Sequence, residues 1–503
     1  MVLDNLTLSN TKINFIEQVF FGETPWELWT DNIQNKNVEI TNISTTCTYD
    51  KSQNAWRSWV DLEITNSGNA WRAEYATTID LPEGCWISDY YLYVDSIKEQ
   101  GILAEKKSAM WVFSNIRNEN RDPGILYYLT GNKVAFRIFP FADEEVRKTG
   151  IEFLHKEPVK LNIDNHIVEL GNAEETVYEN AETDYVIYVS SEYKKTLNQV
   201  YRKPYYHFLV DVSEGKKELA DEFTKRIEQF IAGNTAFSEN TKISFVNTYV
   251  TSFPLDKNWK QYYQSQTFEG GFFLDRAIKM SLLNCNKDKF YPVNVVITDC
   301  MKNAILDEDF SDFKFAFPEN ENDFFYHLDE NGNYYKHSLL NNPQKEIPVI
   351  FKECCFCYPA LEYKISDSII VYLPNNREPS IVLKKDIVKI QESEIKEKDW
   401  ISALTMQAKW MSQMLHPETS DKEWLNLVKY SFISKVMAPV TSYLVVENEA
   451  QKAILIKKQE QVLSSNKSLD LDEDTQRMSE PSLWLLTILL GLAMLYKQKS
   501  KVI

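Results

Sequence analysis

Apolar and polar residues alternate with a period of two through much of residues 41–155. In the stretch VAFRIFP, for example, Val134, Phe136 and Ile138 alternate with Lys133, Ala135 and Arg137. Such alternation is typical of a strand with one buried face. Breaker stretches such as NSGN, LPEG, RDPG and TGNK separate similar runs. The pattern predicts antiparallel strands that are joined by turns and pack as a β-sandwich.

The pattern changes at residue 205. YYHFLVDVS is a continuous apolar run that ends near Asp211, and it is followed by Leu219, Phe223, Ile227 and Phe230 at helical spacing. A second strand (KISFVNTYV), a helix (LDRAIKMSLLN) and a third buried strand (PVNVVITDC) come next. Alternation of buried strands and amphipathic helices predicts a three-layer, Rossmann-like α/β domain over residues 205–318, with a parallel sheet covered by helices.

Beyond residue 318 the alternation of strands and helices stops. FFYHLDENGNYYKHSL predicts a hairpin around Asn331-Gly332. Further on, an apolar stripe predicts a core-facing helix; its members are Ile401, Leu404, Ala408, Met411 and Leu415. We therefore expect a multidomain α+β protein. Its predicted parts are an N-terminal segment (1–40), the β-sandwich (41–155), a polar connector with one strand (156–204), the α/β domain (205–318), a β-rich region (319–390), a helical region with a final strand (391–463), a linker (464–477) and a C-terminal segment (478–503).

Composition narrows the classes of function. A chain of 503 residues is too long for a single hydrophobic core, and a net charge of −18 argues against a nucleic-acid partner. No phosphate-binding loop or nucleophile elbow is present. The histidines are scattered, and we expect no pair of them at metal-ligand spacing; they are His155, His166, His207, His327, His337 and His416. We predict a protein that is not an enzyme, with a hydrolase located after residue 318 as an alternative.

Residues 81–153 resemble the VIT domain, the module of vault and inter-alpha-trypsin inhibitor heavy-chain proteins. The matching elements occur in order along the chain: Leu81-Pro82-Glu83-Gly84, Glu105-Lys106 with Ala109, Arg121-Asp122-Pro123-Gly124, Gly131-Asn132 and Phe139-Pro140. The resemblance implies a β-sandwich, which agrees with the fold predicted independently from the period-two pattern.

HFLVDVSEG and VVITDC are similar to the first and fourth strands of a von Willebrand factor A (vWA) domain. That resemblance implies a divalent-cation site, onto which Asp211, Ser213 and Asp299 match. Gly215 replaces a second serine, and Phe272 takes the place of the usual threonine. Because two hydroxyl ligands are lost, we expect a degenerate site. The alternative is a ligand-binding protein that depends on Mg²⁺, with water, Glu214 or Glu269 supplying the missing oxygens.

The C-terminal segment begins with Met478, Ser479, Glu480 and Pro481 and continues into an apolar run and the basic end KQKSK. This order is similar to the MSEP-type member of the PEP-CTERM sorting signals, which exosortases recognise in bacterial envelopes. Leu483–Tyr496 supplies 14 residues, or about 21 Å of helix against a hydrocarbon core of roughly 30 Å. Flanking aromatic and lysine side chains can compensate for the difference. We therefore predict a membrane helix with a cytoplasmic C-terminus. The alternative is a packed amphipathic or core helix, which the length of the run alone would favour.

Together these features predict an exported, single-pass membrane protein of the bacterial cell envelope. Its expected partners are the membrane, an exosortase-type processing enzyme and a protein or polysaccharide ligand, and its expected role is adhesion or assembly. The first residues lack a basic region followed by an apolar core, which conflicts with export. Members of the sorting-signal family are thought to carry further membrane segments upstream, so the resemblance implies that this sequence begins at a late start codon or is a fragment. With a degenerate site we expect no cofactor, and Mg²⁺ is the cofactor only on the alternative of a cation-dependent ligand-binding protein.

Overall fold

The computed structural model describes residues 37–460, except for 69–71, 95, 119–122, 130–131, 234–239, 286, 308–309, 311–323, 341, 350–357, 367–368, 447–451, 454 and 458. These residues form a mixed α and β fold that is rich in strands and contains several sheets. The chain divides into the units Met1–Gln459 and Glu460–Ile503, and every element below belongs to the first. The predicted linker and the sorting signal with its membrane helix lie outside the described residues. No helix within the described residues is long and apolar enough to cross a membrane.

The described strands between residues 38 and 170 pair antiparallel, as the period-two pattern predicts, and belong to two sheets. Tyr90 and Phe136, one from each sheet, meet edge to face with ring centroids 5.9 Å apart, so the sheets share core contacts. The first sheet has the order β1 (Val38–Asp50), β2 (Ala55–Asn66), β9 (Val146–His155), β4 (Cys85–Val94) and β5 (Ile97–Gln100). The second has the order β11 (His166–Leu170), β10 (Val159–Ile163), β3 (Ala73–Asp80), β8 (Lys133–Phe141), β7 (Gly124–Tyr128), β24 (Thr441–Val445) and β6 (Ile102–Glu105).

Strand β8 differs from the strand with one buried face that its alternation predicts. Ala135 belongs to the same buried cluster as Phe113 of helix α2 (Lys106–Asn118). Arg137 is only 6% exposed, and its Nε donates to Oε1 of Glu74 at 2.7 Å. The prediction of a single buried face is wrong here, because alternation along one strand does not reveal the helix and the counter-charge that cover its second face.

Strand β24 joins residues that are far apart in the sequence. It lies between β6 and β7, where Ser442 is aligned with Ala104 on one side and with Tyr127 on the other. The final strand expected within residues 391–463 is therefore present, and it completes a sheet of the N-terminal region.

The connector, residues 156–204, contains more strand than predicted. Val159, Leu161 and Ile163 alternate with exposed residues in β10, which pairs with β11 and with β3. Further along, β12 (Ala181–Glu182) and β13 (Val186–Val189) form a small sheet with β23 (Ser380–Leu383), and helix α3 (Ser191–Lys194) follows β13. The expectation of one strand joining one neighbour is wrong, because the abundance of acidic residues obscured the short period-two runs.

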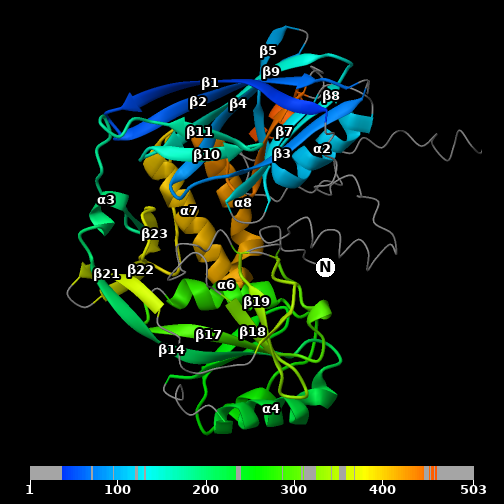
Figure 1. Cartoon of the computed structure of the whole chain (residues 1–503), viewed down its shortest axis with the longest axis vertical. Coiled ribbons are helices and arrows are strands. Elements are labelled where there is room, and N and C mark those ends of the chain that lie inside the picture. Colours follow the sequence, from blue (N-terminus) through cyan, green and yellow to red (C-terminus); the bar gives the residue numbers. More distant parts are fainter. Residues whose placement is uncertain are drawn as a thin grey trace, which may run out of the picture. The chain divides into compact units, whose positions relative to one another are not determined.

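The α/β region has the predicted alternation. Parallel strands β14 (Asn198–Asp211), β15 (Lys242–Val246) and β17 (Phe290–Ile297) form its centre. Phe230 of helix α4 (Ala220–Gly233) packs on Phe208, with ring centroids 5.4 Å apart. On the other face, Oγ of Ser281 in helix α6 (Leu274–Cys285) lies 3.2 Å from Nδ1 of His207. Figure 1 shows these two helices on opposite faces of the sheet. Strand β16 (Val250–Pro254) and helices α5 (Trp259–Gln264), η2 (Lys217–Leu219) and η4 (Met301–Asn303) complete the region.

The predicted hairpin around Asn331-Gly332 is confirmed, and it extends the same sheet. Strand β18 (Phe324–Leu328) pairs parallel with β17 and antiparallel with β19 (Tyr334–Ser338), and β19 pairs with β20 (Ile347–Val349). His327 and His337 lie on these paired strands with ring centroids 6.5 Å apart. Spacing along the chain indicated no such pair, and here strand pairing brings together two histidines that are ten positions apart.

The helical region after residue 391 packs as its apolar stripe predicts. Helix α7 (Trp400–Leu415) buries Leu404, Ala408, Met411 and Leu415. Its first residue, Trp400, contacts Trp86 and Tyr188 and donates from Nε1 to the carbonyl of Gly84 at 3.0 Å. The remaining described elements are β21 (Tyr358–Ser366), β22 (Ile369–Pro374), η7 (Glu392–Glu394) and α8 (Pro417–Ser434).

Candidate functional site

Two of the three predicted cation ligands lie at the carboxyl ends of neighbouring parallel strands. These two are Asp211 and Asp299. Val210 of β14 is aligned with Ile297 of β17. Asp211 is the last residue of β14, and Asp299 is the second residue after β17, directly after Thr298. The carboxyl ends of parallel strands are where open α/β sheets usually bind ligands. Asp211 is fully buried and Ser213 is nearly so.

Thr298 lies between the two aspartates. Its hydroxyl oxygen is 2.8 Å from Oδ2 of Asp211 and 3.3 Å from Oδ1 of Asp299. Oδ1 of Asp211 accepts from the backbone N–H of Ser213 at 3.0 Å. The structure thus brings Asp211, Ser213 and Asp299 together around a threonine that sequence reasoning missed, although it directly precedes Asp299.

Lys216 supplies a positive charge to this site. Its ammonium group forms a salt bridge with Oδ1 of Asp299, and its side chain is only 11% exposed. The backbone reaches Lys216 through a tight turn in which Lys216 N–H donates to the Ser213 carbonyl at 3.2 Å. Gly215 adopts a φ of 83° in that turn, in the left-handed region that favours glycine over serine. We call Asp211, Ser213, Lys216, Thr298 and Asp299 the strand-end cluster.

Phe272 does not contribute an oxygen to the strand-end cluster. Its side chain is 2% exposed, and its carbonyl accepts from the N–H of Ile305 at 2.8 Å. The proposed substitutes, Glu214 and Glu269, are both exposed, and Glu269 accepts from the Thr267 hydroxyl at 3.1 Å. Hydroxyl and carboxylate oxygens of the strand-end cluster could therefore hold a cation only if the Lys216 ammonium moved away.

The two aspartates have opposite pKa shifts. Burial raises the pKa of Asp211 above its ordinary value, although hydrogen bonds from Ser213 and Thr298 oppose this. Burial also acts to raise the pKa of Asp299, but the hydrogen bond and charge of Lys216 outweigh it and lower that pKa. A built-in ammonium thus performs the charge-balancing role that a bound cation would otherwise have.

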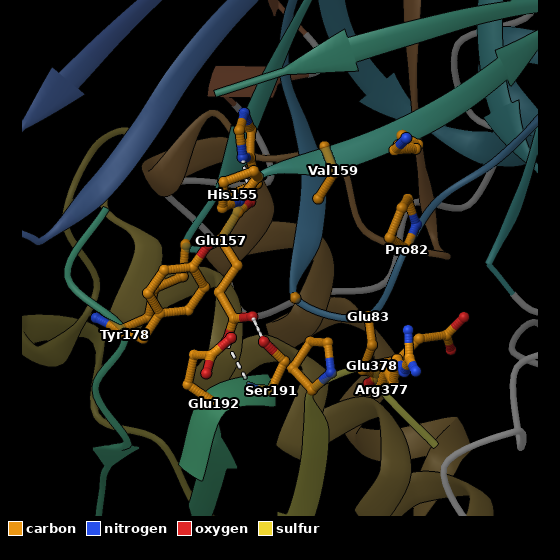
Figure 2. A pocket seen from close by; sticks show the side chains of 15 residues that line it. Pro82, Glu83, His155, Glu157, Val159, Tyr178, Ser191, Glu192, Arg377 and Glu378 are labelled. Carbon is orange, nitrogen blue, oxygen red and sulfur yellow. Dashed lines mark hydrogen bonds between the residues drawn. The ribbon is translucent and has the colours of Figure 1, made fainter. Parts of the chain in front are cut away.

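A second candidate is a cavity of about 270 Å³, whose lining includes Glu83, Glu157 and, from much later in the chain, Arg377. Figure 2 shows Glu157 pointing toward Ser191 in this cavity. The Glu157 carboxylate accepts from the Ser191 N–H at 2.9 Å, from the Tyr188 hydroxyl at 3.0 Å and from the Ser191 hydroxyl. His155 holds the same segment through its Nδ1, which lies 2.7 Å from the Glu157 carbonyl. Since this buried carboxylate already has three donors, we assign it a structural role.

No protein-family model matches this chain, and none of the curated proteins matches it.

Proposed function

We propose that this chain is a non-enzymatic protein of the bacterial cell envelope, in which a VIT-like and a vWA-like region form a scaffold for adhesion or assembly. The observation that carries the proposal is the salt bridge of Lys216 with Asp299. In a scaffold with its own counter-charge, a partner can bind without a metal ion. The partner is a protein or polysaccharide of the envelope.

The arrangement of the sheets supports the two family assignments. Antiparallel sheets in mutual contact, over residues 38–170, are what the VIT resemblance implies. Parallel strands between helices, with Asp211 and Asp299 following β14 and β17, are what the vWA resemblance implies. Strand β24 and residue Trp400 connect distant parts of the chain to the N-terminal sheets, and such connections favour a scaffold over independent modules.

The proposed location depends on the C-terminal segment. Met478, Ser479, Glu480 and Pro481 resemble a sorting motif, and the apolar and basic residues after them resemble a membrane anchor. On this proposal the C-terminus is cytoplasmic before processing, and an exosortase-type enzyme cuts near the motif. Pro481 would favour an extended backbone at the preceding residue and so keep the motif out of the helix.

The C-terminal mass of the mature protein tests the proposed location. The chain should be produced in a bacterium that has exosortase sorting, and the protein recovered from each envelope fraction should be analysed by mass spectrometry. Loss of the residues beyond the motif is the expected result. Recovery of an intact Ile503 in the soluble fraction would overturn the envelope assignment.

A second candidate function is Mg²⁺-dependent ligand binding, because the strand-end cluster does bring two carboxylates and the hydroxyls of Ser213 and Thr298 together. Thermal unfolding of the full chain at millimolar Mg²⁺ distinguishes the two functions. We expect an unchanged Tm, since Lys216 already pairs with Asp299. A clear rise in Tm would instead favour the cation-dependent function.

A further inference from the structure

The β18–β19 hairpin gathers three potential metal ligands at one edge of the α/β sheet. Phe325 is aligned with His337, and His327 with Tyr335, so the two histidines are diagonal neighbours on one face of the hairpin. Glu346 directly precedes β20, which pairs with β19. One ligand atom from each of His327, His337 and Glu346 lies within 4.8 Å of the other two. We call these three residues the hairpin cluster.

His337 presents a free lone pair to the cluster. Its Nδ1 lies 2.8 Å from the carbonyl oxygen of Pro343. Because a carbonyl can only accept, Nδ1 carries the proton and Nε2 carries the lone pair. The residue is fully buried, and Nε2 has no hydrogen-bond partner among the described residues. A buried acceptor without a partner is costly unless a ligand occupies the position.

His327 has the same arrangement with its nitrogens exchanged. Its Nε2 faces the carbonyl oxygen of Thr298 at 3.4 Å, which leaves the lone pair on Nδ1. That atom lies 3.5 Å from Oε1 of Glu346 and has no hydrogen-bond partner in the described part of the chain. Two acceptors thus face each other, which is unfavourable unless a proton or a metal cation lies between them.

We propose that Nδ1 of His327, Nε2 of His337 and the carboxylate of Glu346 bind a divalent transition metal of the zinc class. Imidazole nitrogens suit Zn²⁺ and its neighbours, whereas Mg²⁺ and Ca²⁺ prefer oxygen ligands. Two histidines and one carboxylate leave the fourth position of a tetrahedral ion to water. Ligands at about 2.0–2.1 Å from such an ion lie roughly 3.4 Å from one another. Nδ1 of His327 and Oε1 of Glu346 are already 3.5 Å apart, and the three ligand atoms, which lie within 4.8 Å of one another, must move closer together around the ion.

The surroundings of the cluster favour metal binding in two further ways. Each imidazole has a backbone carbonyl opposite its second nitrogen, which fixes the tautomer in the manner typical of metal-binding histidines. A bound ion would also link β18 and β19 to the segment before β20, at the edge of the sheet. The site lies in the stretch after residue 318, for which the sequence left a hydrolase open.

Zinc titration of the full chain tests the proposal. Protein freed of metal with a chelator should bind Zn²⁺ in a stoichiometric, calorimetrically measurable step, and its Tm should rise and then fall again on addition of EDTA. His337→Gln and Glu346→Gln should each weaken the affinity about tenfold or more. Glu346→Gln is decisive if the buried histidine variant does not fold, because Glu346 is exposed.

Two matched variants serve as controls. Glu330→Gln removes an exposed carboxylate from the same hairpin, and His166→Gln removes an exposed histidine from β11; both should bind Zn²⁺ like the wild type. Absence of stoichiometric binding would overturn the proposal. Affinity unchanged in Glu346→Gln would also overturn it, because the zinc would then bind elsewhere.

Discussion

The strand-end cluster and the hairpin cluster belong to neighbouring strands of one sheet, but they differ in whether their acceptor atoms have a donor or a positive charge as a partner. In the strand-end cluster, Asp211 accepts from Ser213 and Thr298, and Asp299 pairs with Lys216. In the hairpin cluster, lone pairs of two buried histidines and a carboxylate converge without a described donor. The cluster that resembles a known cation site is thus internally neutralised, while the cluster without a recognisable motif requires a cation.

Thr298 connects the two clusters. Its hydroxyl donates to Asp211, while its carbonyl faces Nε2 of His327 and accepts from Nη1 of Arg226 at 2.9 Å. A substitution in one cluster can therefore affect the other through Thr298. Substitutions at Asp211, Lys216 and Glu346 can separate the contributions of the two clusters.

Asp211→Ala should have the largest effect on stability. The substitution leaves the buried Ser213 N–H without its acceptor and the Thr298 hydroxyl with only its longer contact to Asp299, which should cost about 2–3 kcal/mol in the free energy of unfolding. Urea denaturation of the full chain measures the loss, which should not depend on Mg²⁺. Glu269→Ala, an exposed carboxylate at the same edge, is the control and should change stability by less than about 0.5 kcal/mol. A wild-type midpoint for Asp211→Ala would contradict a structural role for this carboxylate.

Lys216→Met should have an intermediate effect. It removes an ammonium that is 11% exposed but pairs with a carboxylate that is 38% exposed, so solvent screening limits the loss to about 1 kcal/mol. Because the internal cation is gone, millimolar Mg²⁺ should now raise the Tm of the variant and not that of the wild type. Lys217→Met, at an exposed neighbour, should show neither change. If Mg²⁺ does not change the Tm of Lys216→Met, the oxygen atoms of the strand-end cluster are not arranged to bind a cation.

Glu346→Gln should have a smaller effect whose sign depends on zinc. In the wild type, Nδ1 of His327 faces a carboxylate oxygen of Glu346 at 3.5 Å. In the presence of a chelator, the amide of the variant can instead donate a hydrogen bond to Nδ1, which should stabilise the protein by about 0.5 kcal/mol. With excess Zn²⁺ the variant should instead have a lower Tm than the wild type, because it binds the ion less tightly. Thermal unfolding with and without Zn²⁺ measures both signs. Destabilisation of the variant in chelator would indicate a protonated His327 that pairs with Glu346.

Local periodicity predicted the elements that carry the strand-end cluster. The apolar run before Asp211 became β14, and Phe223, Ile227 and Phe230 became the buried face of α4. Asp211, Ser213 and Asp299 lie close together because the carboxyl ends of the parallel strands β14 and β17 are at the same edge of the sheet. Lys216 was missed, since its pairing depends on the turn geometry at Gly215 and not on residue type alone.

The hairpin cluster could not be predicted from the sequence, because it depends on the register in which β18 and β19 pair. A two-residue turn at Asn331-Gly332 would align His327 with Lys336, whereas the structure aligns it with Tyr335. A shift of one residue moves side chains to the opposite face, so the sequence could not decide whether the two histidines meet. The same limit applies to β24, whose partners lie more than three hundred residues earlier.

The pH dependence of stability should show the smallest effect and the opposite roles of the two aspartates. The raised pKa of Asp211 means that the folded state holds its proton above the unfolded value of 3.8, so this group lowers stability as pH rises through that window. Asp299, with its lowered pKa, contributes stability that is complete above the unfolded value and is lost as pH falls through the folded one. Urea midpoints between roughly pH 3 and 6 measure the slopes. Asp211→Asn should remove the first contribution and Asp299→Asn the second; identical slopes in both variants would mean that Lys216 does not distinguish the two carboxylates.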